Sequence, residues 1–114
     1  MVGPVDLAYE DRHLRDLCLK HRRAISHLGP VLAQQLQKRI ADVRAAECAM
    51  DLRVVGALFV EDDAGKFIVI PLEGSFSLIL VANHVQPPLM TDGAVNWLEV
   101  TRVKVSGLAR GTGS

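Results

Sequence analysis

The sequence is poor in aromatic residues and cysteines, and it has no long apolar run. Aromatic residues make up 4% of its 114 residues, and its only cysteines, Cys18 and Cys48, lie far apart in the sequence. Isolated cysteines are typical of small buried hydrophobic residues rather than of a disulfide or a metal pair. No apolar run is long enough to cross a bilayer, and the first residues lack the basic start and apolar block of a signal peptide. We therefore expect a cytoplasmic protein without a membrane partner.

Several motifs of enzyme chemistry are also missing. The histidines show none of the spacings that are typical of metal ligands, and no glycine-rich phosphate loop follows a predicted strand. Ser75 and Ser77 lack the sequence context of a nucleophile elbow. Asp62 and Asp63 fit a turn better than a calcium loop. The sequence therefore predicts neither a metal ion nor another cofactor.

The composition is that of a folded domain. Hydrophobic residues make up 49% of the sequence, far more than in chains that stay disordered. The length suffices for one hydrophobic core and is too short for two, so we predict a single domain over residues 1–114. Trp97, the only tryptophan, is expected in that core. The small, polar residues 107–114 predict a frayed tail.

Charge is balanced overall, with 13 basic and 13 acidic residues, but the basic residues gather in the first half. Beyond Val54 they are Lys66, Arg102, Lys104 and Arg110, and acidic residues outnumber them there. A protein that gripped nucleic acid through its sheet would show the opposite bias. A basic cluster runs from His13 to Arg23. It could bind an anionic surface, although a solvated helix face and loop explains it better.

Residues 29–52 carry the clearest helical pattern. Leu32, Leu36, Ile40 and Val43 recur at steps of three or four residues, whereas the intervening positions are largely polar. Pro30 suits the first position of a helix, because an amide hydrogen bond is not needed there. Residues 11–21 predict a shorter helix, and residues 22–28 a connection or a continuation of that helix.

The remaining segments predict strands over residues 5–9, 54–60, 66–72, 75–85 and 95–105, with a polar hairpin loop over residues 61–65. In the strand over 75–85, alternation places Phe76, Leu78, Leu80 and Ala82 on one face and Ser77, Ile79 and Val81 on the other. This order predicts an α+β domain with a small antiparallel sheet of four to five strands and two N-terminal helices on one face. The opposite face is left for a ligand or partner.

Four blocks of the sequence carry a family resemblance. They are LRDLC at 14–18, LGPVLAQQLQKRIADVRAAECAMDL at 28–52, GKF at 65–67 and DGAVNWLEVTRVKV at 92–105. Together they resemble the HigB-type toxins, or plasmid maintenance system killer proteins, of the RelE/ParE superfamily. The resemblance implies a RelE-like fold and the toxin half of a type II toxin–antitoxin pair. Implied partners are a cognate antitoxin, expected to be a helix-turn-helix DNA-binding protein, and the ribosome with its mRNA.

Active members of that family are ribosome-dependent mRNA endonucleases that work without a metal. They use arginine and lysine to stabilise charge on the scissile phosphate, and tyrosine or histidine for proton transfer. The sequence departs from this pattern. Ala57 stands where the family usually has a histidine, and Phe76 and Ser77 stand at its tyrosine and arginine. Residues 108–110 replace an aspartate-tyrosine-histidine sequence.

Two other residue sets are candidates for binding. Lys66, Arg102 and Lys104 could form a substitute nucleic-acid site, although ordinary surface charges explain them better. Apolar Leu58, Val60, Ile79 and Val81 point to a face that a protein partner covers. Three functions therefore stay open. They are an mRNA endonuclease toxin, a catalytically degenerate module that holds an antitoxin or regulator, and a toxin with a target other than RNA.

Overall fold

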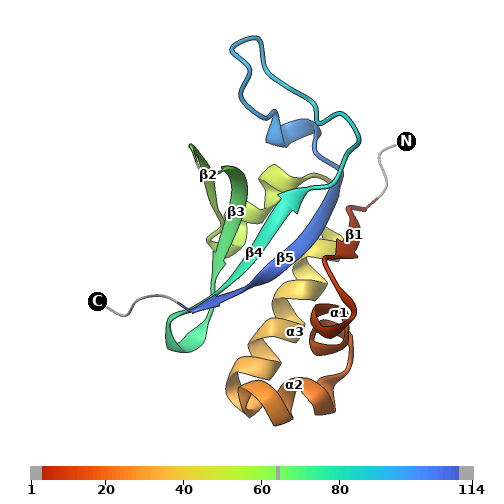
Figure 1. Cartoon of the computed structure of the whole chain (residues 1–114), viewed down its shortest axis with the longest axis vertical. Helices are drawn as coiled ribbons and strands as arrows, with labels where there is room; N and C mark the ends of the chain where they lie inside the picture. Colours follow the sequence, from red (N-terminus) through yellow and green to blue (C-terminus); the bar gives the residue numbers. More distant parts are fainter. Residues whose placement is uncertain (1–3, 64, 111–114) are drawn as a thin grey trace.

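The computed structural model describes residues 4–63 and 65–110. The strands are β1 (Asp6–Tyr9), β2 (Leu58–Asp62), β3 (Gly65–Pro71), β4 (Phe76–Ala82) and β5 (Arg102–Arg110). The α-helices are α1 (Arg12–Leu19), α2 (His21–Leu28) and α3 (Pro30–Ala45), and the 3-10 helices are η1 (Ala49–Val55), η2 (Glu73–Ser75) and η3 (Trp97–Glu99). Figure 1 shows the strands side by side, with the α-helices together beside the sheet.

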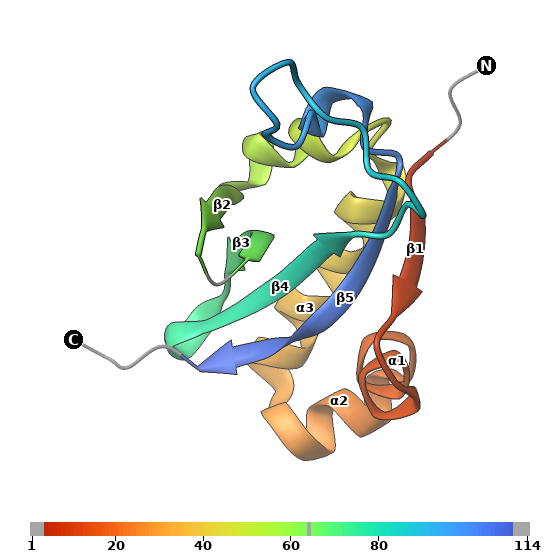
Figure 2. The ribbon, with the colours of Figure 1, turned by 45° about the horizontal axis from the view of Figure 1, so that its top comes forward.

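The strands form one mixed sheet in the order β1-β5-β4-β3-β2. Strand β1 runs parallel to β5, and every other neighbouring pair is antiparallel. Helix α3 lies behind β4 and β5 in the view of Figure 2, and no helix of the described residues lies over the opposite face of the sheet. The predicted α+β class, with a mostly antiparallel sheet, is confirmed.

The core lies between α3 and the sheet. Leu36 and Val43 of α3 are fully buried, as are Leu78 and Leu80 of β4. Removing one such side chain from water contributes about 1.5–3 kcal/mol to folding. Trp97 of η3 is also buried, as predicted, and its ring lies 5.4 Å from that of Phe59. The periodic apolar residues of the long helix therefore cover one face of the sheet, as their spacing predicts.

The long helix is shorter than its sequence pattern predicts. It ends at Ala45, and Ala46 has the extended angles φ −67° and ψ 146°. Tertiary backbone hydrogen bonds hold this exit, because the amide of Val5 donates to the carbonyl of Ala46 and the amide of Ala49 donates to that of Val100, both at 2.8 Å. The chain then enters the 3-10 helix η1. None of the helices in the described ranges is both long and apolar enough to cross a membrane.

The segment that follows β1 forms two helices. Asp11 caps α1, since its carboxylate accepts a hydrogen bond of 2.9 Å from the amide of Leu14. The backbone leaves the helical conformation at Lys20, with φ −106° and ψ 99°. Residues 21–28 then form α2, so this part of the chain is a separate helix and not only a connection.

The last strand lies later in the sequence than predicted. Residues 95–101 form a loop with η3, and β5 begins at Arg102. It pairs with β4 through Arg110, across from Phe76, so residues 107–110 are ordered strand rather than frayed tail. Residues 111–114 lie outside the described part of the chain. Strand β2 likewise begins at Leu58, after a left-handed Gly56 (φ +88°), and not at Val54.

Candidate partner-binding face of the sheet

The face of the sheet turned away from α3 is largely apolar, and we call it the open face. One row of cross-strand partners crosses four strands, with Leu58 beside Val69, Val69 beside Ile79, and Ile79 beside Gly107. Leu58 is 58% exposed, whereas Val69 and Ile79 are half-buried. Side chains that are cross-strand partners lie about 4.5–5.5 Å apart at Cβ, so this row forms a continuous apolar surface.

A second set of partners extends this surface. Val60 of β2 pairs with Phe67 of β3, and Val81 of β4 pairs with Lys104 of β5. Val60, Phe67 and Val81 are two residues from Leu58, Val69 and Ile79 in their respective strands, so alternation puts their side chains on the same face. Covering apolar area of this kind contributes about 25 cal/mol per Å². The open face is therefore suited to a partner with apolar side chains.

The structure brings together all four residues that the sequence predicts as partner contacts. Leu58 and Val60 lie on β2, and Ile79 and Val81 on β4, all on the open face. The β3 residues between them, Phe67 and Val69, are not among the predicted partner contacts. The available signal was the alternation of these two residues with Ile68 and Ile70, which are fully buried on the opposite face.

The predicted cationic residues do not converge on one site. Lys66 lies on the α3 side of β3, two residues before buried Ile68, and its Nζ donates to the carbonyl of Gly93 at 3.2 Å. Lys104 and Arg102 lie on the open face, but the ammonium group of Lys104 is 3.2 Å from a carboxylate oxygen of Glu10. A compensated charge attracts a phosphate weakly. These residues therefore fit ordinary surface charges better than a joint phosphate site.

The positions at which the HigB-type toxins carry catalytic residues also lie in different parts of this fold. Ala57 is 7% exposed and belongs to the hydrophobic core, whereas Ser77 lies on the open face between Pro71 and Ala109. Phe76 packs against the core, and the guanidinium of Arg110 lies 5.6 Å from the centre of its ring. A side chain at position 57 and one at position 77 therefore cannot act on the same phosphate.

Tyr9 and the buried thiol of Cys18 lie away from the open face. Tyr9 pairs with the buried Val105, and the Arg44 guanidinium donates to its hydroxyl at 3.4 Å. Burial raises the pKa of Tyr9, although the positive charge of Arg44 opposes this. Burial also raises the pKa of the Cys18 thiol to about 12. Both groups therefore stay protonated near neutral pH and do not supply a base or a nucleophile there.

The described residues contain no group of three or more histidine, cysteine, aspartate or glutamate side chains that could hold a metal ion. The open face therefore offers an apolar surface for a partner and not a cluster of reactive groups.

No family model matches the chain, and neither curated proteins nor solved structures give a match.

Proposed function

We propose that this chain is the toxin-type component of a cytoplasmic type II toxin–antitoxin pair, and that its open face holds the antitoxin. The observation that carries the proposal is the apolar row of Leu58, Val69 and Ile79 on a sheet face that no described helix covers. The four sequence blocks that resemble HigB-type toxins support the toxin–antitoxin context. The α+β architecture, with helices before a mostly antiparallel sheet, is compatible with it.

We favour partner binding over RNA cleavage because of the chemistry that the open face offers. Phosphoryl chemistry without a metal needs cations near the phosphate and a group that transfers a proton. Position 77 carries a hydroxyl, and Lys104 is paired with Glu10. Arg102 is exposed and has no carboxylate within 4 Å among the described residues, so it is one available cation. A single cation beside an apolar surface favours a docking role.

The proposal is tested by co-purification with the product of the adjacent gene. Leu58→Glu places a charge at the β2 end of the apolar row, and Leu58 is exposed enough to be replaced without disturbing the core. Val54→Glu is a matched control, because Val54 is 90% exposed and lies on η1, outside the open face. We expect the Leu58 variant to lose the partner and the Val54 variant to keep it. Equal retention by both variants would contradict the proposed face.

A growth assay separates the remaining functions. Expression of the chain alone should be tolerated if it is a degenerate binding module, and should arrest growth if it is an active toxin. Arrest accompanied by mRNA ends at codon-linked positions would identify an endonuclease. Arrest without such ends would identify a toxin with another target. In either active case, relief of arrest by the adjacent gene product would still support the toxin–antitoxin pairing.

A further inference from the structure

Helices α1 and α2, with Lys20 between them, concentrate positive charge, and we call them the basic helix pair. Its cations are Arg12, Arg15, Lys20, Arg22 and Arg23, and Asp16 is the only acidic residue among residues 12–28. The formal net charge of the whole chain is zero, so this excess of positive charge is matched by negative charge elsewhere. Such an asymmetry gives one end of the molecule a strong positive potential.

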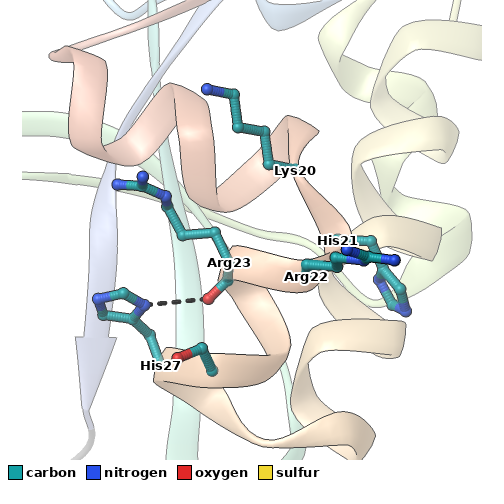
Figure 3. Close-up of a pocket in the computed structure, with 6 residues that line it drawn as sticks. Lys20, His21, Arg22, Arg23 and His27 are labelled. Atoms are coloured by element: carbon teal, nitrogen blue, oxygen red, sulfur yellow. Dashed lines mark hydrogen bonds between the residues drawn. The ribbon is translucent and has the colours of Figure 1, made fainter.

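The structure joins these cations into one surface. Residues of α2 and Lys20 line a depression of about 760 Å³, and an adjoining one of about 290 Å³ is lined by α1 residues and also by Lys20. The larger depression is lined by Lys20, His21, Arg22, Arg23, Ser26 and His27, without an apolar side chain. Figure 3 shows Arg23 and His27 on one side of α2, and His21 and Arg22 on the other.

Most of this charge is free for a ligand. Asp16 lies 3.5 Å from the ammonium of Lys20 and 3.9 Å from the guanidinium of Arg23, so one carboxylate is shared by two cations. Arg12, Arg15 and Arg22 are exposed, and no carboxylate of the described residues lies within 4 Å of them. Arginine side chains bind phosphate oxygens with two parallel hydrogen bonds.

The two helices are also held relative to each other. The rings of His13 on α1 and His27 on α2 make an edge-to-face contact with centres 5.6 Å apart. The Nδ1–H of His27 donates to the carbonyl of Arg23 at 3.0 Å, because a carbonyl oxygen can only accept. The cations therefore project from a packed frame, which lowers the entropic cost of ordering them on a ligand.

These features favour double-stranded nucleic acid over other polyanions. Proteins that bind single strands stack bases on aromatic rings, but residues 12–28 contain no phenylalanine, tyrosine or tryptophan. Membrane-binding helices need a broad apolar face, whereas the exposed apolar residues in this segment are Leu19 and Ile25, at 43% and 37% exposure. The larger depression has no apolar side chain to hold those of an acidic peptide.

We propose that the basic helix pair binds the phosphate backbone of B-form DNA without reading its sequence. Cations on both sides of α2 suit a helix that lies at the major groove with one phosphate chain on either side. An A-form RNA duplex has a narrow major groove that would not admit the helix. This proposal does not rest on the toxin–antitoxin function, because the open face lies on the sheet and not on α1 or α2.

The test is fluorescence anisotropy with labelled DNA and RNA duplexes of about 20 base pairs over roughly 50–200 mM salt. The whole chain should bind DNA with a log–log salt slope of about −3, from about 0.9 for each of the free cations Arg12, Arg15 and Arg22. Arg15→Gln combined with Arg22→Gln should weaken binding by at least about tenfold and reduce the slope by about two. Lys38→Gln combined with Arg53→Gln removes the same charge from exposed positions outside the pair and should change the affinity by less than about twofold.

Several outcomes would overturn the proposal. They are the absence of DNA binding at the lowest salt concentration, an equal loss of affinity in both double variants, and an RNA duplex bound as tightly as DNA. Tighter binding to phosphatidylserine vesicles or to polyglutamate than to DNA at the same salt would identify a lipid or protein surface instead. Thermal unfolding of each variant shows whether a loss of affinity reflects loss of the fold, and the exposed positions chosen should leave the fold intact.

Discussion

Ala57 and Ser77 lie on opposite sides of the sheet. Ala57 is in the core, 7% exposed, whereas Ser77 is a half-buried residue of the open face. The family resemblance assigns both positions to one catalytic site. Because their side chains are separated by the sheet itself, restoring a histidine at 57 and an arginine at 77 would not assemble such a site in this fold.

The two substitutions should therefore differ in their effect on stability. Ala57→His forces a larger, polar ring into the core, and we expect the free energy of unfolding to fall by about 2–4 kcal/mol. Ser77→Arg can extend over the open face and should cost less than about 1 kcal/mol. Urea unfolding of both variants measures the difference. Similar losses for the two would mean that Ala57 is not enclosed as described.

The helix α3 offers a matched pair for testing which of its sides faces the sheet. Leu36 is fully buried, whereas Val31 is 66% exposed on the same helix. We expect Leu36→Ala to lower the free energy of unfolding by about 2–5 kcal/mol, because it leaves a cavity in the core. Val31→Ala should change it by less than about 0.5 kcal/mol, as is usual for surface positions. Chemical denaturation of the two variants checks this, and a large loss for Val31→Ala would reverse the assigned orientation.

The predictable part of α3 is its apolar stripe, and the unpredictable part is its end. Leu36 and Ile40 follow a period that any helix burying one side must have, so the sequence alone identifies the helix. The helical pattern continues beyond Ala45, but the carbonyl of Ala46 accepts a hydrogen bond from the amide of Val5. The partner in that bond is 41 residues earlier in the sequence (46 − 5), so no local pattern can report it.

The open face was predictable in part for a related reason. Alternation along β4 identifies Ile79 and Val81 directly, because their neighbours Leu78 and Leu80 share a buried face. The register of β5 was not predictable in this way. A bulge where β4 residues 79 and 80 meet β5 changes the alternation, and β5 continues to Arg110, five residues beyond the predicted end at residue 105 (110 − 105). Such an irregularity depends on the neighbouring strand.

The two cysteines should differ in their reaction with a thiol reagent. Cys18 is buried and Cys48 is half-buried. Burial raises the pKa of Cys18 from its ordinary value of 9.0 to about 12. Since only the thiolate reacts, the native chain should lose about one thiol per molecule rapidly near pH 8, and the second only on unfolding. Ellman's reagent measures this, with Cys48→Ser as the control that should remove the fast phase.

The same shift makes stability depend on pH at the alkaline end. The folded chain holds the Cys18 proton more tightly than the unfolded chain, so this contribution to stability is fully present below about pH 9. It is lost as the pH rises toward about 12. Cys18→Ala should reduce the pH dependence of unfolding over that range. An unchanged slope in the variant would show that other groups cause the alkaline loss.

His84 connects the end of β4 to the beginning of β5. Its Nε2 accepts hydrogen bonds from the amides of Thr101, at 3.1 Å, and Arg102, at 3.2 Å. Because a nitrogen that accepts carries no hydrogen, the neutral ring bears its hydrogen on Nδ1. His84→Ala removes the acceptor from both amides, and we expect a loss of about 1–3 kcal/mol in the free energy of unfolding, with faster hydrogen exchange at these two amides. His21→Ala, at an exposed position of α2, is the control and should leave both amides protected. Unchanged exchange in the His84 variant would mean that the strand pairing with β4 alone protects the beginning of β5.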